Sequence, residues 1–388
     1  MRIALACGLC LIAVTAIAAP RGKDQTNSEI TNSEIAVAAA TQNAREAFRS
    51  RMNENVVTIM AGSPSGTDLA VVQDLAEVLG DGDNLRILPI VGKGPEQNIR
   101  DVMFLRGVDM GITQANLLKH FDRTGELGPN LKNQIAYIAK LFNEELHVLV
   151  RSDVNDIRDL NGKYVNFGPV GGGAEITGRL IFVALGLTVQ GLNLSDADAI
   201  EKLKSGEIDA AIAVTGKPAP AFASLKEETG LKLLAVPYAK ALENDYYPAT
   251  LTHEDYPTLV AEGESLDTVS ACAVLVSFNW PSSSVRYKKI ATFVDRFFSN
   301  FDDFLDAPRH PKWRDVNFAA TLEGWERSPL AQNWIDNAKA NDTQSASRGN
   351  FDAFLAEASG TSGKPITEAE RADLFRAFLK WNRGQESN

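Results

Sequence analysis

The chain has 388 residues, of which 44% are hydrophobic and 23% are charged, and its formal net charge is -11 at pH 7. This composition is typical of a globular protein with a normal core, long enough for two lobes or domains. The excess of 50 acidic over 39 basic residues argues against nucleic acid or an anionic membrane surface as a general partner. An anionic ligand would therefore have to be held by local dipoles.

Residues 1–18 predict a secretory signal peptide. A basic Arg2 precedes the apolar run Ile3–Ile17, and the small residues Ala16 and Ala18 favour cleavage after Ala18. A membrane anchor is the alternative, but this run is short for a bilayer span. We therefore expect a mature protein that is soluble in the periplasm.

The three cysteines predict no disulfide in the mature chain. Cys7 and Cys10 lie in the signal segment. Neither stands in a convincing lipobox, so lipidation is the less favoured alternative. Cleavage leaves Cys272 alone. Cys272 lies in the apolar run 269–276, which is typical of a buried strand, and we favour a core role over that of a nucleophile.

The segment 19–54 predicts a polar tether followed by a helix. The pentapeptide Thr-Asn-Ser-Glu-Ile occurs twice, at residues 26–30 and 31–35, and such a polar repeat has little reason to fold. From Ile35 to Met52 an alanine-rich periodic pattern indicates a helix. The folded body then begins near residue 55.

From residue 55 onward, strand and helix patterns alternate, which predicts an α/β fold with a largely parallel sheet. The apolar strand Glu145–Arg151 separates a first group of elements from a second. The expected strands are 56–60, 85–90, 110–112, 164–167, 210–214 and 231–236, and the expected helices are 68–79, 95–105, 175–184 and 197–205.

Two long apolar strands predict a hinge between two lobes. One lies near Leu146–Arg151, and the other, Thr268–Phe278, is long enough to cross from one lobe to the other. Together they would join the lobes of a clamshell. The predicted domains are the signal peptide 1–18, the tether and helix 19–54, lobe 1 in 55–151 and 268–284, lobe 2 in 152–267, and a C-terminal extension in 285–388.

The extension is expected to be helical and to pack on lobe 1. Aromatic residues are spaced for packing after Pro281, and Thr367 with Glu370 forms a capping box before a final helix. A separate partner-binding domain is the alternative.

The glycine loop Gly168–Glu175 is the strongest candidate for a binding site. It follows the apolar run 163–167 and precedes a helix-like segment, so its amides and the helix N-terminus would suit a carboxylate or phosphate. Gly168, Gly171, Gly172 and Gly173 are the candidate residues here. A tight turn between strand and helix is the alternative.

Polar residues follow three other strands and predict further ligand contacts. The junction between the first strand and the first helix of the folded body, residues 62–68, supplies hydroxyls and amides at the start of that helix. Ser65 or Thr67 could, however, simply cap the helix. Gln114 closes a strand, where open α/β sheets hold their ligands, and a surface loop amide is the alternative. The candidates are Ser63, Ser65, Gly66 and Thr67 in the first junction, Gln114, and Thr215 with Gly216 in the loop that faces the glycines.

In this order the segments resemble the TAXI branch of the solute receptors of TRAP transporters. The resemblance covers residues 55–280 and implies the type II periplasmic-binding-protein fold. It also implies a small carboxylate ligand, such as an amino acid, a dicarboxylate or an oxo-acid, and a TRAP membrane subunit as partner. The matching positions are Gly94, Asn98, the run 105–114, the set Glu144, His147 and Arg151, the glycine loop, and the run 206–211 with Gly216 and Pro218.

Two departures from the family pattern put the usual ligands in doubt. Members of the family usually carry aromatic residues just after the first loop, where this chain has Asp68 and Leu69. They also carry a hydroxyl in the glycine loop, where this chain has Gly172-Gly173-Ala174. Both changes fall on expected ligand contacts.

We therefore expect a monomeric binding protein that is not an enzyme, with no cofactor and no metal. Glu144 could meet a ligand ammonium group, with a surface salt bridge as the alternative, whereas His147 in an apolar strand favours a core histidine. The four histidines, His120, His147, His253 and His310, form no zinc signature, and the first loop has Pro64 where a nucleophile elbow needs serine. A sensing or scaffold protein of the same fold is the alternative function.

Overall fold

We describe a computed structural model of the chain over residues 25–64, 66–82, 84–226 and 230–339, with side chains of the first helix from residue 35 onward. The signal peptide expected at 1–18 and the capping box at Thr367 and Glu370 lie outside these residues. The chain divides between Glu54 and Asn55 into two compact units, and each is described by itself.

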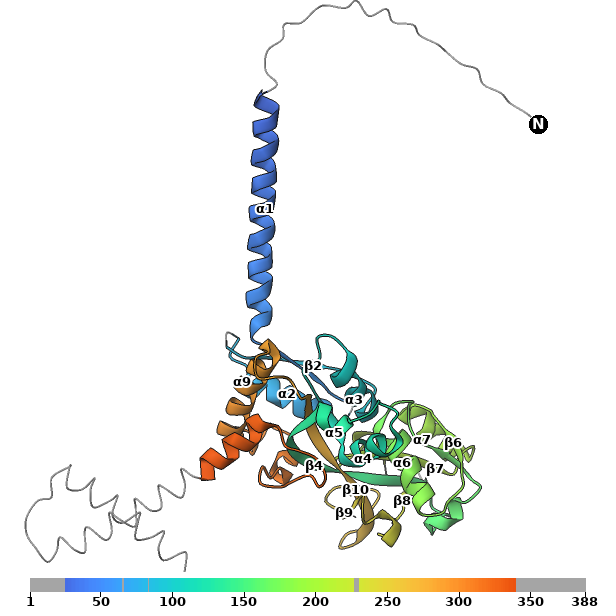
Figure 1. Cartoon of the computed structure of the whole chain (residues 1–388). Coiled ribbons are helices and arrows are strands. Elements are labelled where there is room, and N and C mark those ends of the chain that lie inside the picture. The colour runs from blue at the N-terminus through green and yellow to red at the C-terminus, as the bar shows by residue number, and fades with distance from the viewer. Residues whose placement is uncertain (1–24, 65, 83, 227–229, 340–388) are drawn as a thin grey trace, which may run out of the picture. The chain divides into compact units, whose positions relative to one another are not determined.

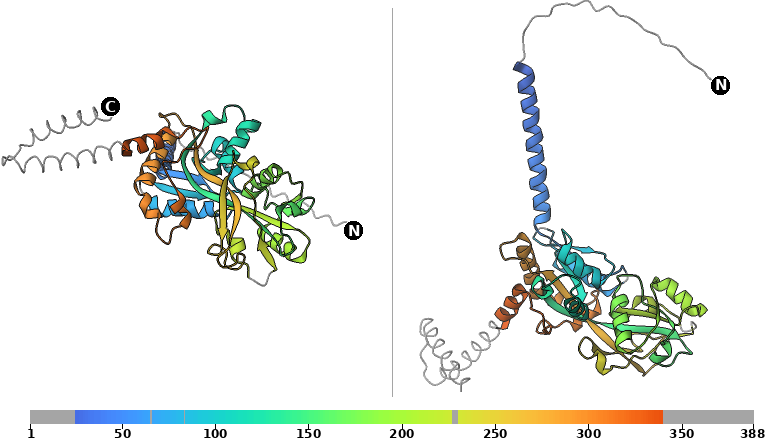
Figure 2. Two further views of the ribbon diagram at one scale, coloured as in Figure 1. Left: turned by 90° about the horizontal axis from the view of Figure 1, so that it is seen from below. Right: turned by 45° about the vertical axis from the view of Figure 1, so that its right-hand side comes forward.

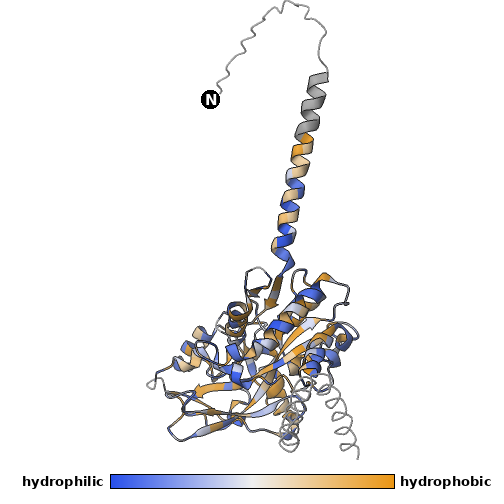
Figure 3. Cartoon of the chain, turned by 90° about the vertical axis from the view of Figure 1, so that its left-hand side faces the viewer, coloured by the Kyte–Doolittle hydropathy of each residue, from blue (hydrophilic) through white to orange (hydrophobic). Residues whose placement is uncertain are grey.

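The described part of the first unit is the helix α1 (Gln25–Glu54). It begins at Gln25 and so includes both copies of the pentapeptide, for which we expected a tether. The absence of glycine and proline from this segment leaves nothing that breaks a helix. Its described side chains mix polar with exposed apolar residues such as Val37 and Phe48 (Figure 3). No helix in the described ranges is long and apolar enough to span a bilayer.

The second unit is built on one ten-stranded sheet with the strand order β2-β1-β3-β10-β4-β7-β5-β6, with β8 beside β4 and β9 beside β10 (Figure 1). The strands are β1 (Val56–Met60), β2 (Arg86–Ile90), β3 (Met110–Gln114), β4 (Ile135–Arg151), β5 (Tyr164–Asn166), β6 (Gln190–Leu192), β7 (Ala210–Thr215), β8 (Leu231–Leu233), β9 (Tyr247–Thr252) and β10 (Ser265–Phe278).

The sheet is mixed, so the expectation of a largely parallel sheet is wrong for its centre. Pairs among β1, β2 and β3, and among β5, β6 and β7, are parallel. The two long strands β4 and β10 run antiparallel to each other and to the neighbours that they join. Each parallel group is the sheet of one lobe, and the antiparallel centre is the hinge.

Helices follow the strands of both lobes. In lobe 1 these are α2 (Thr67–Leu79), α3 (Pro95–Phe104), α4 (Ala115–Thr124) and α5 (Leu131–Gln134). In lobe 2 they are the 3-10 turn η1 (Ile157–Leu160), α6 (Gly173–Ala184), α7 (Asp196–Ser205), α8 (Pro220–Ala223) and the 3-10 turn η3 (Lys240–Leu242). Parallel strands of one group all end at the same edge of the sheet. In lobe 1, α2 and α3 therefore begin at the edge where β1 and β2 end, and in lobe 2, α6 begins at the edge where β5 ends.

Each long strand contributes to the cores of both lobes. Ile138, Leu141 and Phe142 of β4 pack in lobe 1, whereas Leu146 and Val148 pack in lobe 2. β10 divides in the same way, with Ala271 in the lobe 2 core and Val274 in that of lobe 1. The cores therefore meet at residues 143–145, earlier than the lobe boundary that we placed at residue 151. Figure 2 shows both strands running from lobe 1 into lobe 2. This arrangement confirms the predicted clamshell of two α/β lobes joined by hinge strands.

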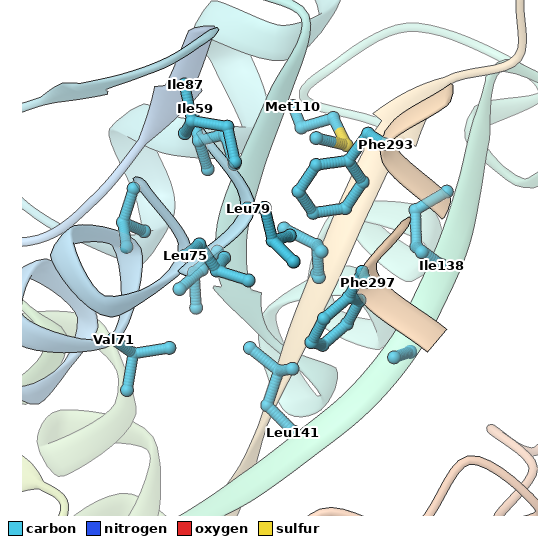
Figure 4. Close-up of a cluster of buried hydrophobic side chains, with 14 of the residues drawn as sticks. Ile59, Val71, Leu75, Leu79, Ile87, Met110, Ile138, Leu141, Phe293 and Phe297 are labelled. Carbon is cyan, nitrogen blue, oxygen red and sulfur yellow. The ribbon is translucent and has the colours of Figure 1, made fainter. Parts of the chain in front are cut away.

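The described part of the extension packs on lobe 1. It contains α9 (Val285–Ser299) and two 3-10 turns, η4 (Phe301–Phe304) and η5 (Pro311–Asp315), so irregular segments contribute beside helix. Phe297 is fully buried and its ring meets those of Phe293, Phe304 and Trp313. Figure 4 shows Phe297 close to Leu141 of the hinge strand. The described part of the extension thus belongs to the lobe 1 core.

We predict that Phe297→Ala destabilises the protein by about 3–5 kcal/mol, because it leaves a cavity among buried aromatic rings. The matched control is Phe104→Ala, since Phe104 is 65% exposed. Urea unfolding followed by intrinsic fluorescence measures both free energies. Equal effects of the two substitutions would contradict the assignment of the extension to the lobe 1 core.

Candidate functional site

A cleft of about 570 Å³ lies where the two lobes meet. Its lobe 1 wall comes from the loops that precede α2 and α3, and its lobe 2 wall from the glycine loop, the start of α7 and the end of β7. Glu144 of β4 also lines the cleft. The N-termini of α2, α3, α6 and α7 therefore all border one cavity, where the positive ends of their helix dipoles favour negative charge.

Most of the residues that the sequence singled out lie at this cleft. Those that line it are Ser63, Gly66, Thr67, Glu144, Gly168, Gly172, Gly173 and Thr215. Gln114, Gly171 and Gly216 lie beside it and contact lining residues, as described below. Ser65 lies outside the described residues.

The lobes contact each other directly across the cleft. The hydroxyl of Thr67 lies 3.2 Å from that of Thr215 and donates to the carbonyl of Gly216 at 3.3 Å. A Cβ atom at Gly94 would lie 2.6 Å from the carbonyl oxygen of Gly171. Such close approach of two loop backbones from different lobes shows that this conformation is closed.

Gln114 joins the lobes from behind the cleft. It is fully buried at the end of β3, and its amide nitrogen donates to Glu144 Oε2 at 2.6 Å. The Thr177 hydroxyl of α6 donates to the amide oxygen of Gln114 at 2.5 Å. Its amide is thus occupied by protein groups, and the residue orients Glu144.

Asp68 is a lining residue that the sequence analysis did not select as a site residue. It lies in the first turn of α2, is 5% exposed, and its Oδ1 atom has no hydrogen-bond partner among the described residues. Burial raises its pKa from 3.8 to about 7. Burial, together with the charge of Asp68, raises the pKa of Glu144 well above its usual range. The two carboxyl groups therefore interact in the cleft.

The signal that could have identified Asp68 was its place just after the first loop, where the resembling family carries aromatic residues. An acidic residue in the first helical turn is common for the helix dipole alone, which makes the signal weak. Asp196, in the first turn of α7, lines the cleft as a third carboxylate, and burial raises its pKa as well.

The neighbouring Glu145 faces a different set of groups. Its Oε1 atom accepts from Lys312 Nζ of η5 at 2.6 Å, and both side chains are buried. Its Oε2 atom accepts from the backbone amide of Lys217 in lobe 2 at 2.9 Å. Glu145 therefore ties the extension, the hinge strand and lobe 2 together in the closed form.

His147 lies in the core behind the cleft, in keeping with the reading that the sequence favoured. Its Nε2 atom lies 2.6 Å from the Tyr256 hydroxyl, in a hydrogen bond whose direction depends on the ring tautomer, and that hydroxyl accepts from the Ala219 amide. Burial lowers the pKa of His147 to about 4, so the ring is neutral. In the described ranges, no group of three or more His, Cys, Asp or Glu side chains could hold a metal ion.

Comparison with known proteins gives one family match and several solved structures of low sequence identity. The model of the NMT1-like family matches residues 59–307, more than half of the chain. Among solved structures, periplasmic binding protein BugD is 14% identical with a TM-score of 0.43, and the match covers 74% of this chain and 95% of BugD. A periplasmic transporter is 13% identical with a TM-score of 0.42, covering 74% and 93%. A TctC solute binding protein from Polaromonas is 14% identical with a TM-score of 0.38, covering 67% and 86%.

We predict that the unliganded protein loses stability as the pH rises through about 7, because the pKa of Asp68 is raised on folding from 3.8 to about 7. A carboxyl group with a raised pKa contributes stability that is complete below the unfolded pKa and is lost above the folded one. Thermal unfolding at several pH values measures this. Asp68→Asn should remove much of the decrease in stability with rising pH. Asp267→Asn, at an exposed position, should leave that decrease unchanged. An unchanged pH profile in Asp68→Asn would rule out this carboxyl as the source.

A second prediction concerns the buried ion pair. Lys312→Met should destabilise the protein by about 3 kcal/mol, because it leaves the buried Glu145 without its cation. Adding Glu145→Gln to Lys312→Met should recover part of the lost unfolding free energy. Lys202→Met, which breaks the exposed pair with Glu207, should change the unfolding free energy little. A double-mutant cycle by urea unfolding checks this, and additive effects of the Lys312 and Glu145 substitutions would contradict the coupling.

Proposed function

The chain belongs to the NMT1-like family, and we propose that it is an extracytoplasmic solute-binding receptor. In this proposal it captures a small carboxylate, such as an amino acid, a dicarboxylate or an oxo-acid, between its two lobes. The observation that carries the proposal is the closed cleft between two α/β lobes, bordered by four helix N-termini. Binding, and no catalytic step, is assigned to this cleft.

The glycine loop is suited to hold the carboxylate. Gly173 and Ala174 are the first residues of α6, so their amides have no acceptor within the helix. Gly168 and Gly171 have φ values of 71° and 83°, a backbone conformation that other residues adopt at a cost. Within this loop the amide of Gly171 donates to Glu175 Oε2 at 2.6 Å and that of Gly172 to the Pro169 carbonyl, so the amides of Gly173 and Ala174 are the ones left for the ligand.

Closure around the ligand supplies the signal for delivery. Lobe contacts such as Thr67 with Thr215 form only when the cleft is closed, and a ligand that touches both walls adds to them. We propose that the closed form is recognised by the membrane subunit of a TRAP-type transporter, in keeping with the resemblance to the TAXI branch. The proposed setting is the periplasm.

The direct test is native mass spectrometry of the mature protein before and after gentle unfolding, followed by a thermal-shift screen of amino acids, dicarboxylates and oxo-acids. We expect a retained small molecule, or a melting shift that saturates with one compound. The absence of both across the whole screen would overturn the receptor assignment.

We predict that Gly94→Ala weakens ligand binding at least about tenfold, or about 1.4 kcal/mol. The added methyl group would lie 2.6 Å from the Gly171 carbonyl and keep the lobes apart. Gly107→Ala is the matched control, since Gly107 also has a positive φ, of 93°, but faces open space. Calorimetric titration with the compound found in the screen measures both affinities. Equal affinities in the two variants would contradict closure at Gly94.

A further inference from the structure

We propose that Asp68 and Glu144 form a cation subsite in the cleft, so that the ligand carries a protonated nitrogen that faces these two carboxyl groups. The inference rests on the proposed function, because it takes the cleft to be the ligand site. It narrows the ligand from carboxylates in general to compounds that also bear an ammonium or similar cationic group.

The geometry of the two side chains carries this inference. They come from different elements, Asp68 from the first turn of α2 and Glu144 from the hinge segment of β4, and both line the cleft. Each is 5% exposed or less. Gln114 satisfies one oxygen of Glu144, but Asp68 Oδ1 has no hydrogen-bond partner in the described part of the chain. A buried polar atom without a partner is costly, and a ligand donor at this position would satisfy it.

The charges around the cleft favour the same conclusion. Three carboxyl side chains, Asp68, Glu144 and Asp196, line it, and Lys93 is the only basic side chain among its described lining residues. Lys312 is near, but it is bonded to Glu145 and Asp315. Among the described residues, no cation therefore forms an ion pair with Asp68 or Glu144, although the charge of Lys312 lowers the pKa of Glu144.

When no ligand is bound, a proton on the carboxyl pair takes the place of the ligand's cationic group. Two interacting carboxyl groups in a buried site cannot both ionise without large cost, so they retain a proton near neutral pH. Two neighbouring charges act on Glu144 in opposite directions, since Glu145 raises its pKa and Lys312 lowers it. Cys272 of β10, whose thiol pKa is raised to about 11 by burial, stays neutral, as does His147. A ligand ammonium group that enters should then release a proton to solvent.

A dicarboxylate or oxo-acid presents no such group to this side of the cleft. One of its carboxylates could use the amides at the N-terminus of α6, but a second would meet Asp68 and Glu144. A zwitterion satisfies both ends, with its carboxylate at the helix N-terminus and its ammonium group at the carboxyl pair. The subsite thereby discriminates by charge between ligands of similar size.

The test is calorimetric titration of the full mature protein with matched pairs that differ at one group. The pairs are glutamate with 2-hydroxyglutarate, 4-aminobutanoate with 4-hydroxybutanoate, and 1,4-diaminobutane with 1,4-butanediol. We expect an ammonium member to bind at least about tenfold more tightly than its hydroxyl partner. Titration in buffers of different ionisation enthalpy should show proton release on binding.

Asp68→Asn and Glu144→Gln should each lower the affinity for the ammonium compound at least about tenfold and reduce the proton release on binding. Asp267→Asn should change neither the affinity nor the proton release. Melting temperatures no lower than that of the unchanged protein would show that these variants fold. If hydroxy acids bind as tightly as the amines and Asp68→Asn does not change this, the cation subsite is overturned while the receptor function stands. If no compound of either kind binds, in these titrations or in the wider screen, both proposals are overturned.

Discussion

The structure depends on a single constraint, which is that β4 and β10 each have to serve two hydrophobic cores. β4 has 17 residues, so one strand can pack Phe142 in lobe 1 and Leu146 in lobe 2. The residues between these two positions belong to neither core. They are Asn143, Glu144 and Glu145, and the consecutive carboxylates are held at the junction by a strand that is fixed at both ends.

Strand alternation then gives the two carboxylates different roles. Neighbouring side chains point to opposite faces of a strand, so Glu144 reaches the cleft and Glu145 reaches η5 of the extension. Lys312 neutralises Glu145, and the extension thereby contributes to the hinge as well as to the aromatic core. In the described part of the chain Glu144 has no such ion pair, and the largest charge effect on it comes from another carboxyl group, that of Asp68. The fold thus pairs one buried carboxylate with a lysine and leaves the other carboxyl group at the cleft.

The order of strands and helices was predictable because each has its own local pattern. Helices expected at 68–79 and 197–205 occur as Thr67–Leu79 and Asp196–Ser205. The first half of β4 was not predicted, since its role depends on pairing with a strand far away in sequence. The role of Lys312 was not predicted for the same reason, since its partner Glu145 is 167 positions away in the sequence. Gln114 was expected at the ligand, but a local pattern could not show that Glu144 and Thr177 would occupy its amide.

The two proposals place two kinds of chemistry in this cleft, and their positions explain why the sequence indicated only one of them. Glycine loops before helices are contiguous in sequence, so an anion site at α6 could be inferred from a single segment. The carboxyl pair is assembled from α2 and β4, which no short motif links. In the proposed site, opposite charges on the two sides of a small cavity would select a ligand by its dipole as well as by its size. A closing cleft strengthens that selection, because excluding water raises the cost of any charge left without a partner.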